Sequence, residues 1–136
     1  MNQEEGGILF SGDWQSAWSN ISRLEQYVAW LVKQADRLNA SQLVLMGDLK
    51  EHLNPVDVRV ATAVKQSIQN LAVLGKYPLI VLLGNHDRNG MQDDSGDWFE
   101  LLKGTHVHLI TKPVVFQQGD YRFCCVPYYN DPMKSR

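Results

Sequence analysis

The chain has 136 residues, 44% of them hydrophobic, and a formal net charge of −2. These values are typical of a single soluble globular domain and exclude a largely disordered chain. Lys and Arg are scattered along the sequence, so no basic face points to electrostatic binding of nucleic acid, although bound cations could still neutralise a phosphate substrate.

The sequence carries no targeting or membrane signal. No apolar stretch approaches the roughly 20 residues that a membrane helix needs, and the acidic start Met1–Glu5 is not followed by the apolar core of a signal peptide. The two cysteines, Cys124 and Cys125, are neighbours, and neighbours on a strand point to opposite faces, which makes them poor disulfide partners. We therefore expect a cytoplasmic protein without membrane contact.

Hydrophobic periodicity divides the chain into alternating strands and helices, followed by strands alone. Short apolar runs indicate strands, and apolar residues at spacings of three and four indicate helices. The order is βαβαβα and then antiparallel strands, which predicts an α/β fold with parallel units first. The predicted elements are, in chain order, a strand at 7–12, a helix at 21–38, a strand at 42–46, a helix from Pro55 to Leu74, a strand at 78–83, a short helix at 97–103 and strands at 106–110, 113–117 and 121–126.

Two local features accompany these elements. Asn20 or Ser22 can cap the first helix. In the later part, His106 and His108 would share one face of a strand, because side chains alternate with a period of two. They could form a local metal pair, but we favour the reading that they are two partly exposed side chains.

An oxygen-bearing side chain follows the C-terminal end of each of three predicted strands. These residues are Asp13, Asp48 and Asn85. Ligands of open α/β sheets bind at that edge. Carboxylate and amide oxygens suit divalent ions such as Mg, Mn, Fe(II) or Zn, and a pair of metals can clamp phosphorus for in-line attack. His86 could protonate a leaving oxygen, with the carboxylate of Asp87 holding it in position.

The motifs Gly47-Asp48 and Gly84-Asn85-His86-Asp87, preceded by Asp13, resemble those of the calcineurin-like metallophosphoesterase superfamily. Within it, the chain is most similar to the Mre11/SbcD-type DNA repair nucleases. The resemblance implies a four-layer α/β/β/α sandwich, of which residues 1–136 would form a single, incomplete domain. The later His and Gly-His-x-His motifs of the family are missing from this sequence.

The resemblance also implies a role for each matching residue. Asp13 would bind a first metal, Asp48 would bridge both metals and Asn85 would bind the second. His86 would assist the leaving group with Asp87 orienting it, while a metal-bridging hydroxide attacks the phosphodiester. The implied cofactors are two divalent metal ions, with Mn favoured over Mg, Fe or Zn. The implied partners are DNA or another phosphodiester, a Rad50/SbcC-type ATPase and, as a further alternative, a second copy in a homodimer.

One position departs from the family pattern. The Asp-x-His motif reads Asp13-Trp14-Gln15 here, and the neutral amide of Gln15 would either weaken the first metal site or point away from it. Three further residues are weaker candidates for substrate contact. Arg88 could touch a phosphate, His52 lies in a loop near the motif, and Trp14 could stack on a base.

Three functional hypotheses follow. The leading one is a dinuclear-metal phosphodiesterase that acts as a DNA exo- or endonuclease. The second is a catalytically weak or inactive module that keeps the fold for binding or regulation, and Gln15 together with the missing histidines favours it. The third keeps catalysis but changes the substrate, to a phosphoprotein, a nucleotide or a small phosphodiester.

Overall fold

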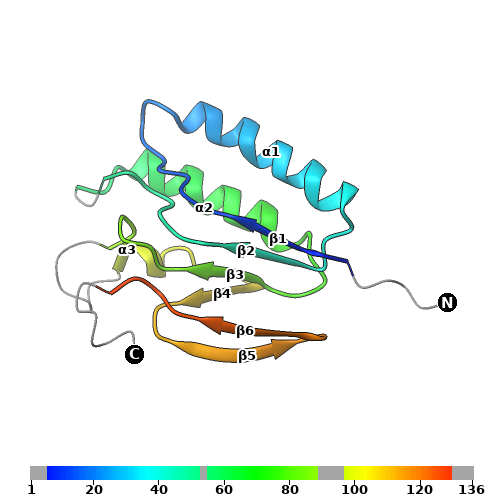
Figure 1. Cartoon of the computed structure of the whole chain (residues 1–136). Helices are drawn as coiled ribbons and strands as arrows, with labels where there is room; N and C mark the ends of the chain where they lie inside the picture. Colours follow the sequence, from blue (N-terminus) through cyan, green and yellow to red (C-terminus); the bar gives the residue numbers. More distant parts are fainter. Residues whose placement is uncertain (1–5, 53–54, 89–96, 130–136) are drawn as a thin grey trace.

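The computed structural model describes residues 6–52, 55–88 and 97–129. The α/β class predicted from the sequence is confirmed, because strands and helices alternate through most of the chain (Figure 1). The elements are β1 (Ile8–Ser11), α1 (Ile21–Arg37), β2 (Gln42–Leu45), α2 (Val58–Ala72), β3 (Leu79–Leu82), α3 (Asp97–Glu100), β4 (Val107–Ile110), β5 (Val114–Gln118) and β6 (Tyr121–Cys125).

The strands form a parallel sheet and an antiparallel hairpin. The parallel sheet has the order β1-β2-β3-β4, and β5 pairs with β6 in a separate two-stranded sheet. The antiparallel section therefore begins one strand later than predicted. β4 runs parallel to β3, with Ile80 opposite His108, because the segment containing α3 returns the chain to the starting edge of the sheet, as a parallel crossover requires.

The parallel sheet separates two apolar clusters. Both long helices cover one face, and the β5–β6 hairpin lies on the other (Figure 1). Alternate residues of one strand serve the two faces, since Leu43 and Leu45 belong to the helix-side core whereas Val44 packs on the hairpin side with Cys125. This two-sided burial explains why β2 is buried at every position and reads as a continuous apolar run.

The helix starts differ from the predictions. The side chain of Asn20 does not cap α1; it accepts a hydrogen bond from the Ala17 amide at 2.8 Å and donates to the Gln15 carbonyl at 3.1 Å. Asn20 occupies the predicted N-cap position and Ser22 lies inside the first turn, but the Asn20 side chain makes no capping hydrogen bond and instead fastens the loop that precedes the helix. α2 begins at Val58, later than the predicted Pro55, because the Asp57 side chain caps it.

The remaining sequence expectations have mixed outcomes. Cys124 is exposed, Cys125 is buried and both thiols are free, as predicted. His106 precedes β4 and has a φ of 60°, so it does not share a strand face with His108, although both are exposed. Within the described ranges, no helix combines the length and the apolar character that crossing a bilayer requires.

Candidate active site

The loops that follow β1 and β2 run side by side at the C-terminal edge of the sheet. The amide of Asp13 donates to the Gly47 carbonyl at 3.1 Å, and the amide of Gln15 donates to the Asp48 carbonyl at 2.9 Å. Asp13, Gln15 and Asp48 all have positive φ, at 53°, 46° and 53°. Left-handed backbone is costly for residues other than glycine and gathers at functional sites, so three of the four predicted metal ligands lie on a strained, interlocked pair of loops.

The loop after β3 meets the loop after β2 backbone to backbone. A Cβ atom added to Gly84 would lie 2.3 Å from the Asp48 amide nitrogen and 2.4 Å from Asp48 Oδ1. One added to Gly47, whose φ is 99°, would lie 2.7 Å from the Gly84 Cα atom. Both glycines of the sequence motifs are therefore required by space, and Gly47 also by its backbone conformation.

Asp87 holds these two loops together from inside the protein. Its carboxylate accepts hydrogen bonds from the amides of Asp48 at 2.8 Å, Leu49 at 2.8 Å and Gly84 at 2.9 Å. The side chain is fully buried, and this burial raises the pKa of the carboxyl group, although the three amide hydrogen bonds favour its charged form. The structure thus gives Asp87 a loop-fastening role in place of the predicted contact with the His86 ring.

His86 is oriented by other groups. Its amide donates to Asp48 Oδ1 at 2.8 Å, and its ring Nδ1 contacts the carbonyl oxygen of Glu51. Since a carbonyl can only accept, Nδ1 is the donor in this contact. The imidazole is thereby oriented by a backbone carbonyl.

Lys50 was missed by sequence reasoning. Its side chain is buried, and its ammonium group donates to the carbonyls of His52 and His86, both at 2.6 Å. Burial lowers the pKa of Lys50 to about 8, against the opposing charges of Asp87 and Asp48. The only sequence signal was a lysine two positions after Asp48, which looks like any solvated loop residue.

The predicted ligands line two different hollows. Asp48 and Asn85 face a shared hollow of about 320 Å³, together with Gly84 and Tyr128. Asp13 lines another, of about 390 Å³, with Trp14, Arg23 and Tyr27 as neighbours. Gln15 is exposed and is joined to Asp48 through its backbone. The fold therefore brings Asp48 and Asn85 together, and it attaches Asp13 to them through the interlocked loops.

The donors present fit a metal site only in part. The Asp48 carboxylate and the Asn85 amide oxygen suit a hard divalent cation. Among residues 6–52, 55–88 and 97–129, however, no group of three or more His, Cys, Asp or Glu side chains is arranged to hold a metal ion. The described residues thus supply part of one oxygen-rich site and do not complete the two-metal centre that the sequence resemblance implies.

The three weaker candidates have different positions. Arg88 is buried, and its guanidinium group donates to the Tyr128 carbonyl and lies 5.5 Å from the centre of the Tyr129 ring. Its burial disfavours direct contact with a substrate, and Arg88 links the motif to the segment after β6. Trp14 is half-buried and donates through its indole nitrogen to Ser11 Oγ at 2.9 Å. His52 is exposed and remains accessible to a ligand.

Comparison with known proteins agrees with this architecture. The sequence profile of the Calcineurin-like phosphoesterase family matches residues 7–131. A protein of Invertebrate iridescent virus 3, named "Putative phosphoesterase 078R", is 28% identical over 129 residues, which cover 93% of this chain and 37% of the viral protein. The chain thus spans little more than a third of that relative. The profile match over most of the sequence shows that this chain belongs to the Calcineurin-like phosphoesterase family.

Proposed function

We propose that this chain contributes to the hydrolysis of phosphodiesters, with DNA as the substrate, in the manner of the Mre11/SbcD-type nucleases that its motifs resemble. The observation that carries the proposal is the position of Asp48. Its carboxylate accepts a hydrogen bond from the His86 amide, its amide donates to Asp87, and it shares a hollow with Asn85. The Asp48 carboxylate and the backbone of His86 are thus joined at the edge where such sheets bind ligands.

The imidazole of His86 is arranged for proton transfer. When protonated at Nε2, it can give that proton to the oxygen of a departing alcohol, while Nδ1–H stays bonded to the Glu51 carbonyl. Lys50 supports the same segment through the His86 carbonyl. A buried ammonium group two residues from Asp48 also adds positive potential where a phosphate would approach.

Members of this family use divalent metals, and we propose Mn as the ion for this chain, with Mg, Fe or Zn as alternatives. Asp48 and Asn85 would be its ligands, and Asp13 would join them in the complete two-metal centre. The Rad50/SbcC-type ATPase partner, a homodimer and a cytoplasmic location stay predictions from the sequence.

A second candidate function is a binding or regulatory module of low activity. Gln15 is exposed where the family has a histidine ligand, and the described residues complete no metal centre. These observations favour a protein that keeps the fold and binds phosphate esters without rapid turnover. The third candidate function is a phosphatase that acts on substrates other than nucleic acid.

Hydrolysis assays separate these functions. We would measure release of p-nitrophenol from bis(p-nitrophenyl) phosphate and from p-nitrophenyl phosphate, and degradation of linear DNA, each with Mn²⁺ or EDTA. The proposal expects slow, Mn-dependent cleavage of the diester and of DNA that is lost in Asp48→Asn, which keeps the shape of the side chain. Asp120→Asn, in the exposed β5–β6 turn, is the matched control. Cleavage of the monoester alone would overturn the nuclease assignment, and a folded, inactive protein would favour the binding module.

A further inference from the structure

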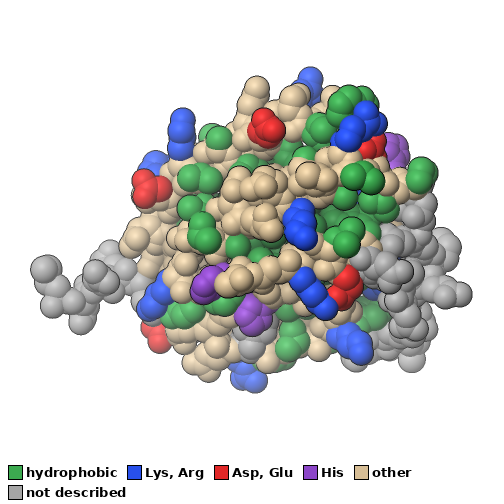
Figure 2. Space-filling model, turned by 180° about the vertical axis from the view of Figure 1, so that it is seen from behind, with side chains coloured by type: hydrophobic (Ala, Val, Ile, Leu, Met, Phe, Trp, Pro, Cys, Tyr) green, Lys and Arg blue, Asp and Glu red, His purple; other side chains and the backbone are tan. Residues whose placement is uncertain are grey.

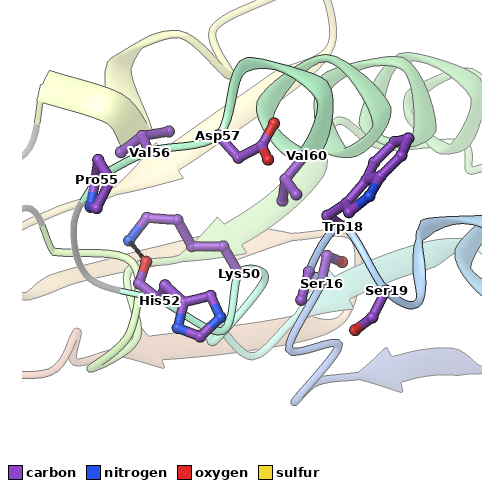
Figure 3. Close-up of a pocket in the computed structure, with 10 residues that line it drawn as sticks. Ser16, Trp18, Ser19, Lys50, His52, Pro55, Val56, Asp57 and Val60 are labelled. Carbon is purple, nitrogen blue, oxygen red and sulfur yellow. Dashed lines mark hydrogen bonds between the residues drawn. The ribbon is translucent and has the colours of Figure 1, made fainter.

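A cavity of about 590 Å³ lies beside the candidate active site, between the β1–α1 loop and the start of α2 (Figure 3). Trp18 forms one side of it, and Pro55 and Val56 lie on the opposite side, with Lys50 between them (Figure 3). This volume lies within the range of pockets that hold small organic ligands. None of the predicted metal ligands lines the cavity.

Trp18 is held in place although it is exposed. The residue is 58% exposed, and the guanidinium carbon of Arg59 lies 3.6 Å from the ring centroid. Arg59 is itself fixed, since it donates to both carboxylate oxygens of Asp57 at 3.0 and 2.7 Å. The indole is thus already ordered by a cation–π contact, so the Trp18 side chain would lose little conformational entropy when a ligand stacks on it.

Two polar groups lie at the base of the cavity. The Ser16 hydroxyl is buried, and the described residues offer it no hydrogen-bond partner. The Lys50 ammonium group donates to the carbonyls of His52 and His86. Through this one side chain the cavity is connected directly to the residue that we assign to the leaving group.

We propose that the cavity binds the nucleobase of the nucleoside that departs from the phosphodiester. An aromatic side chain opposite apolar walls fits a planar heterocycle, and base stacking tolerates every base because each has a π-face. The carboxylate of Asp57 at the rim is neutralised by Arg59, so no free negative charge of the lining opposes a phosphate ester. That this nucleobase belongs to the departing nucleoside rests on the proposed function.

The net charge of −2 favours recognition of the substrate through its nucleobase over recognition through its phosphates. Lys and Arg side chains are dispersed on the face shown in Figure 2 and form no continuous stripe there. Affinity for a nucleic-acid substrate would then depend less on phosphate contacts, whose contribution grows with the number of cations, and more on stacking in this cavity.

Binding of three phosphate esters tests the proposal without any hydrolysis. We would titrate the protein in EDTA with deoxyadenosine 5′-monophosphate, deoxyribose 5-phosphate and octyl phosphate, using calorimetry and the NMR signals of the indole N–H groups. The nucleotide should bind on the order of tenfold more tightly than the other two esters, and the Trp18 signal should shift. Equal affinity for all three esters, or tighter binding of octyl phosphate, would overturn base recognition.

Variants of two exposed tryptophans locate the binding site. Trp18→Ala should remove the tenfold preference for the nucleotide, and Trp18→Phe should retain most of it. Trp30→Ala is the matched control, because Trp30 is 51% exposed on α1 and does not line the cavity. A loss of the preference in Trp30→Ala equal to that in Trp18→Ala would overturn the assignment to this cavity.

The binding test can fail independently of the proposed function. If diester cleavage depends on Mn and on Asp48 but the nucleotide is not preferred, base binding in the cavity is refuted and the proposed hydrolysis is retained. A Trp18-dependent preference in a protein without any hydrolysis would keep the cavity as a nucleotide site and refute catalysis.

Discussion

The carboxylate of Asp87 accepts a hydrogen bond from the backbone amide of Asp48 at 2.8 Å, across 39 residues of sequence. The same carboxylate also accepts the amides of Leu49 and Gly84. One buried side chain therefore sets the distance between the ends of β2 and β3. Because Asp48 and Asn85 extend from those two ends, their separation depends on Asp87.

Replacement of Asp87 should destabilise the fold strongly. Asp87→Ala would leave three amides without an acceptor, and each unsatisfied buried donor costs roughly 1–3 kcal/mol, so we expect a loss of about 3 kcal/mol or more in the free energy of unfolding. Asp87→Asn keeps one acceptor oxygen and should lose less. Urea denaturation followed by circular dichroism measures both. Equal stability of Asp87→Ala and the wild type would show that the loops are held by other contacts.

The cap of α2 should make stability sensitive to acid. The side-chain hydrogen bond from Arg59, with the backbone amide hydrogen bond, lowers the pKa of Asp57 to about 2 from its usual 3.8. A carboxyl group whose pKa is lower in the folded state stabilises the protein above its unfolded pKa and loses that effect as the pH falls towards the folded pKa. The difference in melting temperature between the wild type and Asp57→Asn should therefore shrink between pH 5 and pH 2.5. A constant difference would exclude this linkage; Asp120→Asn is the control.

Restoration of the family's histidine should improve the metal site. Gln15 is joined to Asp48 through its backbone, so a ligand at position 15 would extend from the same pair of loops. Gln15→His should tighten Mn²⁺ binding by about tenfold, which corresponds to roughly 1.4 kcal/mol, as measured by calorimetry. Gln69→His, the same substitution at an exposed position of α2, controls for the added imidazole. Unchanged affinity would mean that residue 15 points away from the metal.

The adjacent cysteines should differ in reactivity. Cys124 is exposed and Cys125 is buried, and burial raises the pKa of the Cys125 thiol, followed by the effect of Cys124. Alkylation by iodoacetamide at pH 8 should modify Cys124 faster than Cys125, because the reagent reaches the exposed thiol and burial disfavours the reactive thiolate of Cys125. Tandem mass spectrometry can follow both sites over time. In Cys124→Ser the fast phase should vanish, and a fast phase that persists would place an accessible thiol at Cys125.

The sequence predicts the elements well because their signals are local. The periodic apolar residues of α1 and the continuous apolar run of β2 reflect faces that the structure buries. The same reasoning placed Asp13, Asp48 and Asn85 at one edge of the sheet, since parallel strands end there together.

The structure departs from the sequence expectations at residues whose contacts depend on tertiary partners. Arg88 looked like a phosphate ligand, but its guanidinium group meets a carbonyl 40 residues away. Asn20 had the residue type of a helix cap, yet its side chain serves the preceding loop. The position of Lys50 two residues after Asp48 did not reveal its burial, because that burial follows from the meeting of two loops. Composition and spacing contain no information about such tertiary contacts.

In the motif at the end of β3, Gly84 acts through its small size, whereas the residues after it act through their functional groups. Gly84 contributes no donor side chain, and its value lies in the absence of a Cβ atom that would meet Asp48. A single added methyl group would wedge the two loops apart while every acidic, amide and imidazole group stayed in the chain. The first residue of the motif therefore governs how closely the reactive groups assemble, and the residues after it govern what they do.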